Sequence, residues 1–346
     1  MEGRRAVPDD KADVIAALQR LASDLAPGGG RVEGVQRLSG GASQQTWAFE
    51  VEGQAGNVPL VLRRAPVRAG ERARMTVGLA TEARLIDAAR AAGVPVPAVR
   101  RVLRADDGLG DGFVMERLAG ETLGRRIVRD ARFADARRVL ARQCGDALAR
   151  IHAMPTRDLP PLRLGGARAE LQRQIDLHRS HRTTRPVFEL AFQWLRAHAP
   201  GEVAPVLVHG DFRNGNLMVD ARGLVGVLDW ELAHLGDPME DLGWLCVNAW
   251  RFGCHERPVG GFGTREELFA GYRAAGGEVD EARVRYWEVL GTLAWGVICE
   301  AMADAWLSGH ERDVEKAAIG RRASESEIDL LALLAPRHDD ARPARA

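Results

Sequence analysis

The chain has 346 residues, 46% of them hydrophobic and 28% charged, which suffices for the cores of two compact lobes or domains. Lysine plus arginine and aspartate plus glutamate number 48 each, so the chain lacks the basic surplus that holds nucleic acid by counterion release, and no nucleic acid partner is expected. The four cysteines show no CxxC spacing and indicate neither a zinc ribbon nor a disulfide framework.

The first 30 residues predict an N-terminal extension that contains one helix. Residues 1–10 are polar and include a proline, so we expect them to be frayed. Apolar residues recur with helical spacing from Lys11 to Leu25, and the glycines at 28–30 end the helix. The start of the chain lacks the apolar stretch of a secretory signal, and no run reaches the roughly 18 apolar residues of a membrane span. We therefore expect a cytoplasmic protein without a membrane partner.

Residues 31–118 predict a small α+β unit built on an antiparallel sheet. The strand-like segments VEGVQRL, QTWAFEV and PLVLRR follow one another, and the turn SGGAS joins the first two. A helix is predicted over residues 76–92, followed by the extended segment VPVPAVRRVLR and the strand GFVMERL.

Residues 119–335 predict a second unit that is mostly helical. Apolar residues recur with helical spacing over residues 134–151, 170–178, 266–275, 284–307 and 328–334. One short β segment interrupts these helices, in which APVLVHG is followed by a small hairpin of LMVD and LVGVLDW. Residues 336–346 are charged and rich in alanine and proline, so a flexible tail is predicted there.

The segment VLVHGDFRNGNLMVDARGLVGVLDWELAHLGDPMEDLGWL carries the most specific pattern in the chain. It places Asp211, Asn216 and Asp229 at loop ends or at the mouth of one hairpin, so a single pocket could hold all three. Two carboxylates and an amide provide hard oxygen ligands, which suit Mg²⁺. Phosphoryl transfer needs such ligands, together with a carboxylate that orients and deprotonates the attacking hydroxyl.

The loop HGDFRNGN resembles the catalytic loop HxDxxxxN of the aminoglycoside phosphotransferase family and, more distantly, the HRDxxxxN loop of protein kinases. This resemblance implies a bilobal protein-kinase-like fold of the α+β class, with an antiparallel sheet and a helix in the N-lobe (residues 31–118) and a mostly helical C-lobe (residues 119–335). It implies that Asp211 is the catalytic base, with His209 as its orienting partner in the catalytic loop. It also implies that Asn216 and Asp229 bind Mg²⁺ and that ATP is the phosphate donor.

The segment that follows fits the same family. LDWE takes the place of the protein-kinase DFG, and GDPMEDLGWL resembles the segment whose two aspartates cap and brace the catalytic loop. These aspartates are Asp237 and Asp241 here, and ordinary helix N-caps remain an alternative interpretation of both.

A glycine-rich turn in the N-lobe is the first candidate for nucleotide binding. Its backbone N–H groups could lie over the phosphates. The turn lacks the GxGxxG pattern of protein kinases, so an ordinary hairpin turn remains open as an alternative. The candidate residues are Gly40, Gly41, Ala42 and Ser43.

The third strand supplies the next candidates. By resemblance Arg63 takes the place of the kinase lysine that holds the α and β phosphates, and Val61, on the same face, lies over the adenine. Arginine keeps the positive charge and offers bidentate phosphate contacts, although its geometry differs from that of lysine. Lysine occurs only at Lys11 and Lys316, so arginine here fits the composition of the chain. Arg64 remains the alternative register.

The remaining nucleotide candidates lie on the following helix and at the junction between the lobes. Glu82 is expected to form the ion pair with Arg63, and a solvated helix face is its alternative. FVMERLAGETL resembles the inter-lobe hinge, which implies that Glu116, Arg117 and Leu118 lie near the adenine edge.

The acceptor is expected to be a hydroxyl group of a small molecule. A site for polycationic aminoglycosides should be rich in carboxylates, yet residues 160–200 contain seven arginines and three acidic residues. Several tryptophans follow, whose alternative role is core packing. The segments VLRRAP and HGDFRNGNLMVD resemble the kinase-like domains found alone in bacteria or fused to acyl-CoA dehydrogenases, which implies a hydroxylated acyl or acyl-CoA-like acceptor. The tryptophans in question are Trp244, Trp250, Trp287, Trp295 and Trp306.

Two other functions remain open at this point. The first is a nucleotide-binding pseudokinase, which is disfavoured because the Asp, Asn and Asp of the pattern are all present. The second is a metal-dependent hydrolase built on His209, Asp211, Asp229 and His234, although two-metal sites usually recruit more histidines and carboxylates than this scattered set offers. GxSxG is absent, so a serine hydrolase has no support. The sequence leaves the oligomeric state and the choice between ATP and GTP open.

Overall fold

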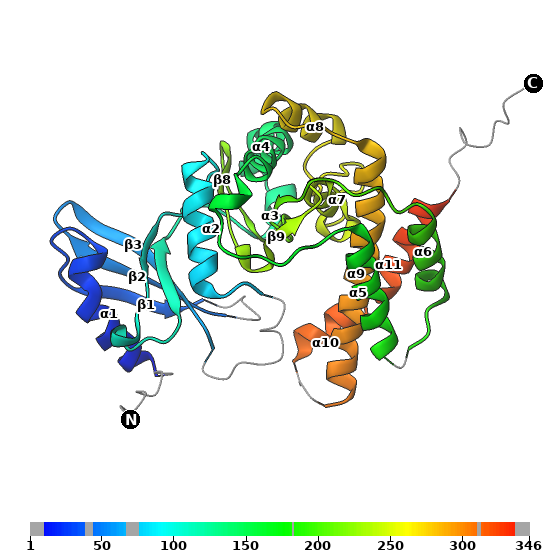
Figure 1. Cartoon of the computed structure of the whole chain (residues 1–346). Coiled ribbons are helices and arrows are strands. Elements are labelled where there is room, and N and C mark those ends of the chain that lie inside the picture. The colour runs from blue at the N-terminus through cyan, green and yellow to red at the C-terminus, as the bar shows by residue number, and fades with distance from the viewer. Residues whose placement is uncertain (1–9, 39–43, 67–75, 182, 310–312, 336–346) are drawn as a thin grey trace, which may run out of the picture.

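The computed structural model describes residues 10–38, 44–66, 76–181, 183–309 and 313–335. A sheet with two helices forms one lobe, on the left of Figure 1, and a mostly helical lobe lies beside it. The predicted α+β class, with an antiparallel sheet preceding a helical part, is confirmed.

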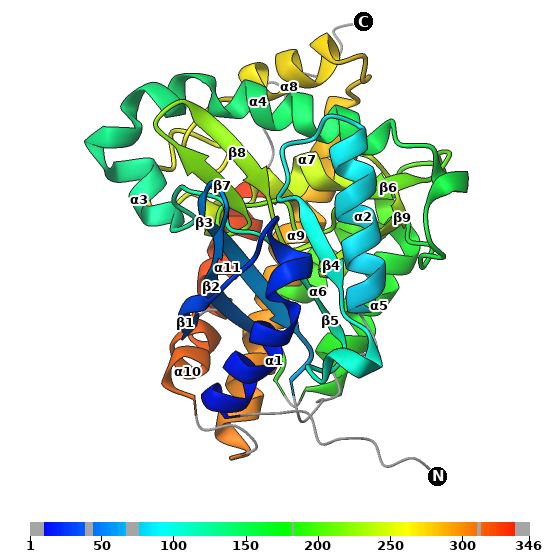
Figure 2. The same ribbon diagram turned by 90° about the vertical axis from the view of Figure 1, so that its left-hand side faces the viewer.

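The first lobe contains a five-stranded antiparallel sheet in the order β1-β2-β3-β5-β4. Each strand overlaps a segment predicted to be extended, although β2 runs two residues past its segment and β3 begins three residues before its own. A helix covers each face, because residues of α1 cluster with one side of the sheet and residues of α2 with the other. Figure 2 shows α1 in front of the sheet. The bounds are α1 Lys11–Leu25, β1 Val32–Arg37, β2 Gln45–Gly53, β3 Gly56–Arg64, α2 Leu79–Ala91, β4 Val99–Val102 and β5 Gly112–Glu116.

Strand β3 sends alternate side chains to the two faces of the sheet. Leu60 and Leu62 belong to the cluster with α1, whereas Arg63 lies on the face that meets α2 and the second lobe. Arg64 is completely buried on the α1 side, where its Nε donates to Gln45 Oε1 at 2.9 Å. Arg63 and not Arg64 therefore faces the second lobe, which decides the register that the sequence left open.

Nine helices lie in the described part of the second lobe, and the five helical ranges predicted there are confirmed with shifted ends. Helices α3, α6, α7 and α10 were not among these ranges. For α3, α7 and α10 the reason is length, because six to eight residues are too few to show a 3.6-residue period. Helix α6 has 12 residues and was missed despite its length. The bounds are α3 Gly124–Arg129, α4 Ala134–His152, α5 Ala167–Ser180, α6 Pro186–Ala197, α7 Met239–Cys246, α8 Arg265–Ala274, α9 Glu281–Leu307, α10 Val314–Gly320 and α11 Ala323–Leu334.

Helix α9 forms the centre of the second lobe, in contact with α5, α6, α7, α10 and α11. Among the described residues it is the one helix long and apolar enough to cross a membrane by length and composition, contrary to the expectation that no such run exists. Half of its most apolar stretch is buried inside the protein. Core helices pass the same test, and the packing of α9 is that of a core helix.

Two short β ribbons position the polar segment of the second lobe. Strand β6 (Val206–Val208) pairs with β9 (His234–Gly236), and β7 (Leu217–Asp220) pairs with β8 (Gly223–Val227). The sequence predicted the hairpin of β7 and β8 but not the pairing of β6 with β9. Strand β9 has only three residues and shows no alternation that could be recognised.

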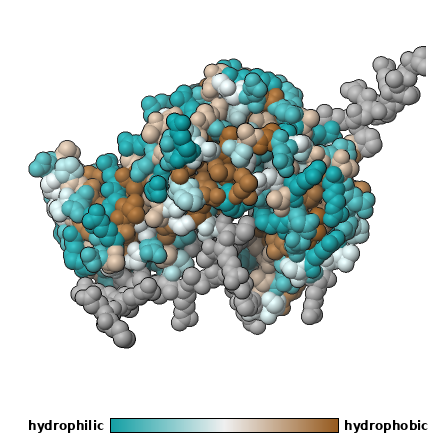
Figure 3. Space-filling view, in the orientation of Figure 1, coloured by the Kyte–Doolittle hydropathy of each residue, from teal (hydrophilic) through white to brown (hydrophobic). Residues whose placement is uncertain are grey.

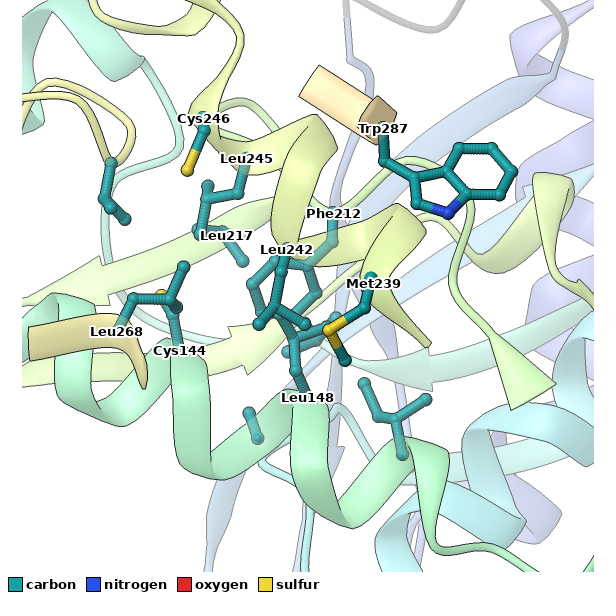
Figure 4. Close-up of a cluster of buried hydrophobic side chains, with 14 of the residues drawn as sticks. Cys144, Leu148, Phe212, Leu217, Met239, Leu242, Leu245, Cys246, Leu268 and Trp287 are labelled. Atoms are coloured by element: carbon teal, nitrogen blue, oxygen red, sulfur yellow. The ribbon is translucent and has the colours of Figure 1, made fainter. Parts of the chain in front are cut away.

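The loop between β6 and β7 is anchored in the core of the second lobe by Phe212, which is completely buried. Figure 4 shows its ring among side chains from α4, α7 and β7, including Leu148, Leu242 and Leu217. Asp211 and Arg213 flank this anchor and stay partly exposed. The core therefore fixes the position of both neighbours.

Candidate active site

The three residues of the predicted catalytic pattern come together at the loop after β6. Asn216 Nδ2 donates to Asp211 Oδ2 at 2.6 Å and to the Asp211 carbonyl oxygen at 2.9 Å. The Leu228 amide donates to the Asn216 carbonyl at 2.8 Å, so Asp229 follows directly beside the same loop. Asp229 has a φ of 64°, a left-handed conformation that non-glycine residues rarely adopt and that concentrates at functional sites.

An arginine from the first lobe meets Asp229. Arg63 Nη2 is hydrogen-bonded to Asp229 Oδ1 and to Glu231 Oε2, the latter at 3.2 Å, while its Nε donates to Glu82 at 3.2 Å. Burial opposes the charge of Arg63, but the three carboxylates outweigh it and raise the pKa of the guanidinium. Burial also dominates at Glu82 and raises the pKa of that carboxyl to about 7, against the attraction of Arg63. Glu231, in the 3₁₀ turn Trp230–Leu232, was not predicted as a site residue.

His209 lies beneath the loop and is completely buried. Its Nδ1 accepts from the Asp211 amide at 3.2 Å, so the ring proton is on Nε2, which lies 3.1 Å from the Leu228 carbonyl. Burial lowers the pKa of His209 and keeps the imidazole neutral. The ring thus joins the start of the loop to the backbone preceding Asp229, which is an orienting role.

Asp241 braces the same loop from α7. Its two carboxylate oxygens accept from the His209 and Gly210 amides at 2.8 and 2.9 Å. His152 Nε2 lies 3.1 Å from Asp241, and His152 Nδ1 lies 2.8 Å from the Tyr272 hydroxyl. Although burial opposes ionisation, these donors lower the pKa of Asp241. His152 and Tyr272 were missed by sequence reasoning, since neither lies near the polar segment in the chain.

Asp237 connects two helices of the second lobe. Its Oδ1 accepts from the Met239 amide at 2.9 Å at the start of α7, and its Oδ2 accepts from Arg283 of α9 at 2.7 Å. Asp237 therefore caps the start of α7, and Asp241 braces the loop after β6. The carboxylates of both residues are bonded to groups of the protein itself.

The carboxylate of Asp211 has two further donors that the sequence did not indicate. Arg213 Nε and Trp244 Nε1 donate to Asp211 Oδ1 at 2.8 and 2.9 Å. Trp244 stands 5.2 Å from Trp250, centroid to centroid, and Trp250 stands 4.9 Å from Trp295. A wall of three indole rings therefore begins at the candidate base.

The candidates for nucleotide binding at the junction of the lobes are placed as follows. Val61 is buried in the sheet opposite Met115. The Glu116 amide donates to the Ala98 carbonyl at 2.8 Å. The Leu118 side chain lies over Gly226 of β8, and within the described part of the chain the Leu118 amide has no hydrogen-bond partner. Gly40, Gly41, Ala42 and Ser43 lie outside the described residues.

The donor set fits a magnesium ion. No group of three or more His, Cys, Asp or Glu side chains that could hold a metal occurs among the described residues. Mg²⁺ is usually bound by one or two carboxylates together with substrate phosphates and water, and Asn216 and Asp229 offer such a partial set. His234, which the hydrolase alternative needs, already lies 3.0 Å from the Leu232 carbonyl and 3.3 Å from Glu240.

Comparison with known proteins gives one family. The model of the phosphotransferase enzyme family matches residues 34–287, which is most of the chain, and it confirms the resemblance read from the catalytic loop.

Two curated relatives have longer chains. The chain is 29% identical over 195 residues to mouse "Acyl-CoA dehydrogenase family member 10" and 28% identical over 239 residues to "Probable acyl-CoA dehydrogenase IBR3" of Arabidopsis thaliana. These matches cover 54% and 62% of this chain but only 18% and 28% of the relatives. The chain therefore spans less than a third of the relatives' length.

Solved structures share the fold over nearly the whole chain. A Ralstonia eutropha protein assigned as an aminoglycoside phosphotransferase superposes with a TM-score of 0.70 at 20% identity, covering 92% of this chain and 97% of its own. A choline/ethanolamine kinase family protein of Mesorhizobium loti gives a TM-score of 0.59 at 20% identity, covering 89% and 90%. At these identities the likeness concerns the fold alone.

Proposed function

Because the chain belongs to the phosphotransferase enzyme family, we propose that it is a small-molecule kinase that transfers the γ-phosphoryl group of ATP, with Mg²⁺, to a hydroxyl of its acceptor. The observation that carries this proposal is the meeting of Asp211, Asn216 and Asp229 with an arginine of the other lobe. A donor nucleotide bound between the lobes would contact both sides of this cluster.

Each side chain then has one task. Asp211 accepts the proton of the acceptor hydroxyl as the oxygen attacks the γ-phosphorus. Arg63, oriented by Glu82, holds the α and β phosphates, which compete with Asp229 for the guanidinium. Held by Asn216 and Asp229, Mg²⁺ would neutralise charge on the β and γ phosphate oxygens.

The nucleotide base belongs at the junction of the lobes. Val61 supplies an apolar surface for the adenine, and the Leu118 amide, which lacks a partner among the described residues, is available to the adenine edge. Glu116 precedes it on the same backbone. The turn that contains Gly40, Gly41, Ala42 and Ser43 is proposed to lie over the phosphates.

For the acceptor we propose a hydroxylated molecule with an apolar part, such as a hydroxyacyl thioester. Glu170 of the insert is unsuited to hold a polycation, since it is already paired with Arg163 and Arg173. The wall of indole rings instead offers apolar surface next to Asp211. Similarity to acyl-CoA dehydrogenase family members supports the same direction.

Helix α9 extends this apolar surface. Trp295, Ile298, Met302 and Trp306 follow one another at helical spacing, and each is partly exposed. In the view of Figure 3, hydrophobic surface lies near the middle of the molecule and among the helices at its right-hand side. An acyl chain on this stripe would keep its hydroxyl end near Asp211.

The proposed function is tested by ADP release with a panel of acceptors: amino sugars, choline-like alcohols, sugars and hydroxyacyl thioesters. Asp211→Ala should lower transfer to the active acceptor by about 100-fold or more, because a general base contributes about that factor. Binding of magnesium-ATP, measured by calorimetry, should stay within about twofold of the parent value, a shift of about 0.4 kcal/mol.

Equal turnover by the parent and Asp211→Ala would contradict the assigned base. If magnesium-ATP protects the fold against heat but no acceptor or water yields ADP, the pseudokinase replaces the kinase. Stimulation by kanamycin-type amines without any response to hydroxyacyl thioesters would refute the acceptor class while leaving the reaction in place.

The acceptor surface has its own test. Met302→Ala and Trp306→Ala should raise KM for a hydroxyacyl thioester by about 10-fold with kcat unchanged, because each removes apolar contact that is equal in ground state and transition state. Leu307→Ala is the matched control, since Leu307 is 80% exposed and falls outside the helical spacing of the stripe. Equal KM values in all three variants would place the acceptor elsewhere.

A further inference from the structure

A cavity of about 240 Å³ lies between the start of α4 and residues 254–261 of the second lobe, and its lining includes none of the candidate site residues. In Figure 2, α3 leads into the start of α4 at the upper left. Arginines from two separate stretches of the chain line the cavity, together with one carboxylate. These charged residues are Arg137, Arg138, Arg257 and Glu256.

The three arginines have donors to spare. Arg137 Nη1 donates to the carbonyls of Ile127 and Asp130, both at 2.9 Å, which fixes the side chain without using a carboxylate. In the described part of the chain, the side chains of Arg257 and Glu256 form no hydrogen bond or ion pair, so these neighbours are not paired with each other.

Arg138 is the one arginine of the three with a carboxylate partner among the described residues. Its side chain is 80% exposed and lies 3.6 Å from Asp135, which is 85% exposed. An exposed pair of this kind contributes little to stability, so the guanidinium can exchange its partner for a ligand.

The charge of the lining favours a phosphate group as that ligand. Three positive charges against one negative charge leave a surplus of two, which matches the charge of roughly −1.5 to −2 on a phosphate monoester at neutral pH. Guanidinium groups gathered in one place repel one another, and a bound anion removes that cost. Their planar forks of donors fit the oxygens of phosphate.

Two further features fit the same ligand. Helix α4 has 19 residues and no side-chain cap, and Ala134, its first residue, lines the cavity, so the positive end of the helix dipole adds to the arginines. Val128 and Cys254 supply an apolar part of the lining. The cavity therefore has room for a small organic group beside the phosphate.

The cavity touches the turn that holds the loop between β6 and β7. Gly261 lines it, and Gly260 and Gly261 have φ values of 54° and 74°, which favour glycine. The Gly260 carbonyl accepts from Asn214 Nδ2 of that loop at 2.5 Å. A ligand in the cavity would thus lie one residue away from a bond that positions the loop.

We propose that this cavity binds a phosphate group, either inorganic phosphate or the phosphate of a small organic ester, through Arg137, Arg138 and Arg257. No covalent bond forms or breaks on binding. The site is separate from the candidate active site, and the proposal does not depend on the proposed function.

Cys254 provides a local readout of the test, because it lines the cavity and is partly exposed, whereas Cys144, Cys246 and Cys299 are buried. Its reaction with the neutral reagent iodoacetamide is followed by mass spectrometry while inorganic phosphate or glycerol phosphate is titrated into the full chain. Chloride keeps the ionic strength constant, so that screening does not change. In the parent, phosphate should slow the modification of Cys254 until the effect saturates.

Arg257→Gln is the informative variant, since the Arg257 side chain has no partner among the described residues and its loss should leave the fold intact. It should raise the phosphate concentration for half-protection by about 10-fold, because charge-assisted hydrogen bonds to the anion are lost. Arg196→Gln, at an exposed arginine in the last turn of α6, is the matched control and should behave as the parent does. Protection at lower concentrations of glycerol phosphate than of inorganic phosphate would identify an ester as the ligand, and equal concentrations would identify the phosphate group alone.

Two results would overturn the proposal. In the first, phosphate slows the modification of Cys254 no more than chloride does at the same ionic strength. In the second, Arg257→Gln and the parent need the same phosphate concentration for half-protection while both keep the same midpoint of thermal unfolding. Neither result bears on the kinase assignment, because no turnover is measured, and a failed acceptor panel would leave this site untouched.

Discussion

At the scale of single residues, the candidate site joins the two lobes through ion pairs between one arginine and several carboxylates. Arg63 is bonded to the carboxylates of Asp229, Glu231 and Glu82, and all four groups are at least partly buried. Burying unpaired charge is costly, so the set is stable only while its members remain paired. Under the proposed function, the nucleotide phosphates would replace Asp229 as a partner of Arg63 and would not simply add to the cluster.

Glu82 gives these ion pairs a measurable pH dependence. Its pKa is raised from 4.5 to about 7, so between these values the folded state binds more protons than the unfolded state. Stability from this site is fully present below pH 4.5 and is lost as the pH rises through about 7. Glu82→Gln cannot ionise. The stability of the variant relative to the parent should therefore improve with rising pH, by up to about 1.4 kcal/mol per pH unit.

Urea unfolding at several pH values checks this expectation. Glu33→Gln serves as the control, because the Glu33 side chain is 50% exposed and pairs only at the surface. A constant difference between Glu82→Gln and the parent from pH 4.5 to 7 would mean that the carboxyl titrates normally in the fold.

At the scale of helices and strands, α1 is the element whose removal should matter most for the first lobe. Its Asp10 cap accepts from the Ala12 amide at 3.0 Å, and its apolar side packs on the sheet behind Arg63. Leu18, completely buried there, packs in one cluster with Leu60 and Leu62. The helix supports the strand that presents the arginine.

Leu18→Ala should lower the free energy of unfolding by about 2–5 kcal/mol, because it removes buried methylene groups and leaves a cavity. Chemical denaturation measures the loss. Leu331→Ala on α11 is the matched control, since Leu331 is 48% exposed, and it should cost much less. Equal losses in the two variants would show that α1 is not bound to the sheet in solution.

Elements with a long hydrophobic pattern could be predicted from the sequence, and short ones could not. The 15 residues of α1 and the 19 of α4 carry several turns of apolar spacing. Helices of six to eight residues span only about two turns, and β9 has three residues, which is too short for a pattern to stand out. Helix α6, with 12 residues, is an exception, because it was missed despite its length.

The candidate site divides in a similar way. Asp211, Asn216 and Asp229 lie within 19 residues of one another in a spaced pattern, and the sequence brings them together. Trp244, His152 and Tyr272 reach the same loop through folding alone, from 33 to more than 60 positions away. No local pattern can indicate such contacts, because they depend on how α4, α7 and α8 pack.

At the scale of the whole molecule, the connection between the lobes is bonded to strand β7 of the candidate site. The amides of Glu121 and Val219 donate to each other's carbonyls at 2.9 and 3.0 Å, which attaches the connector to β7. Gly120 is required beside this bridge, because a Cβ there would lie 2.9 Å from the Met218 side chain and from the Val219 carbonyl.

Gly120→Ala should therefore push β7 away from the connector. We expect a loss of stability of about 1–3 kcal/mol, as for other overpacked positions, together with weaker binding of magnesium-ATP. Thermal denaturation and calorimetry measure the two effects. Gly78→Ala is the control, since a Cβ at Gly78 meets nothing within 4 Å. Unchanged nucleotide affinity in Gly120→Ala would show that the bridge does not hold the ribbon of β7 and β8 in place for the nucleotide.

The bridge between Glu121 and Val219 also fixes where the molecule can bend. We expect a rotation of the sheet against the helical part to turn about residues 117–120, because the chain beyond them is fastened to β7. Displacement in any rotation grows with distance from the axis. Leu60, paired with Glu116 in the sheet, would therefore hardly move, while β1 at the far edge of the sheet would sweep the widest arc. Such a rotation would displace β1 while the residues next to the connector keep their positions.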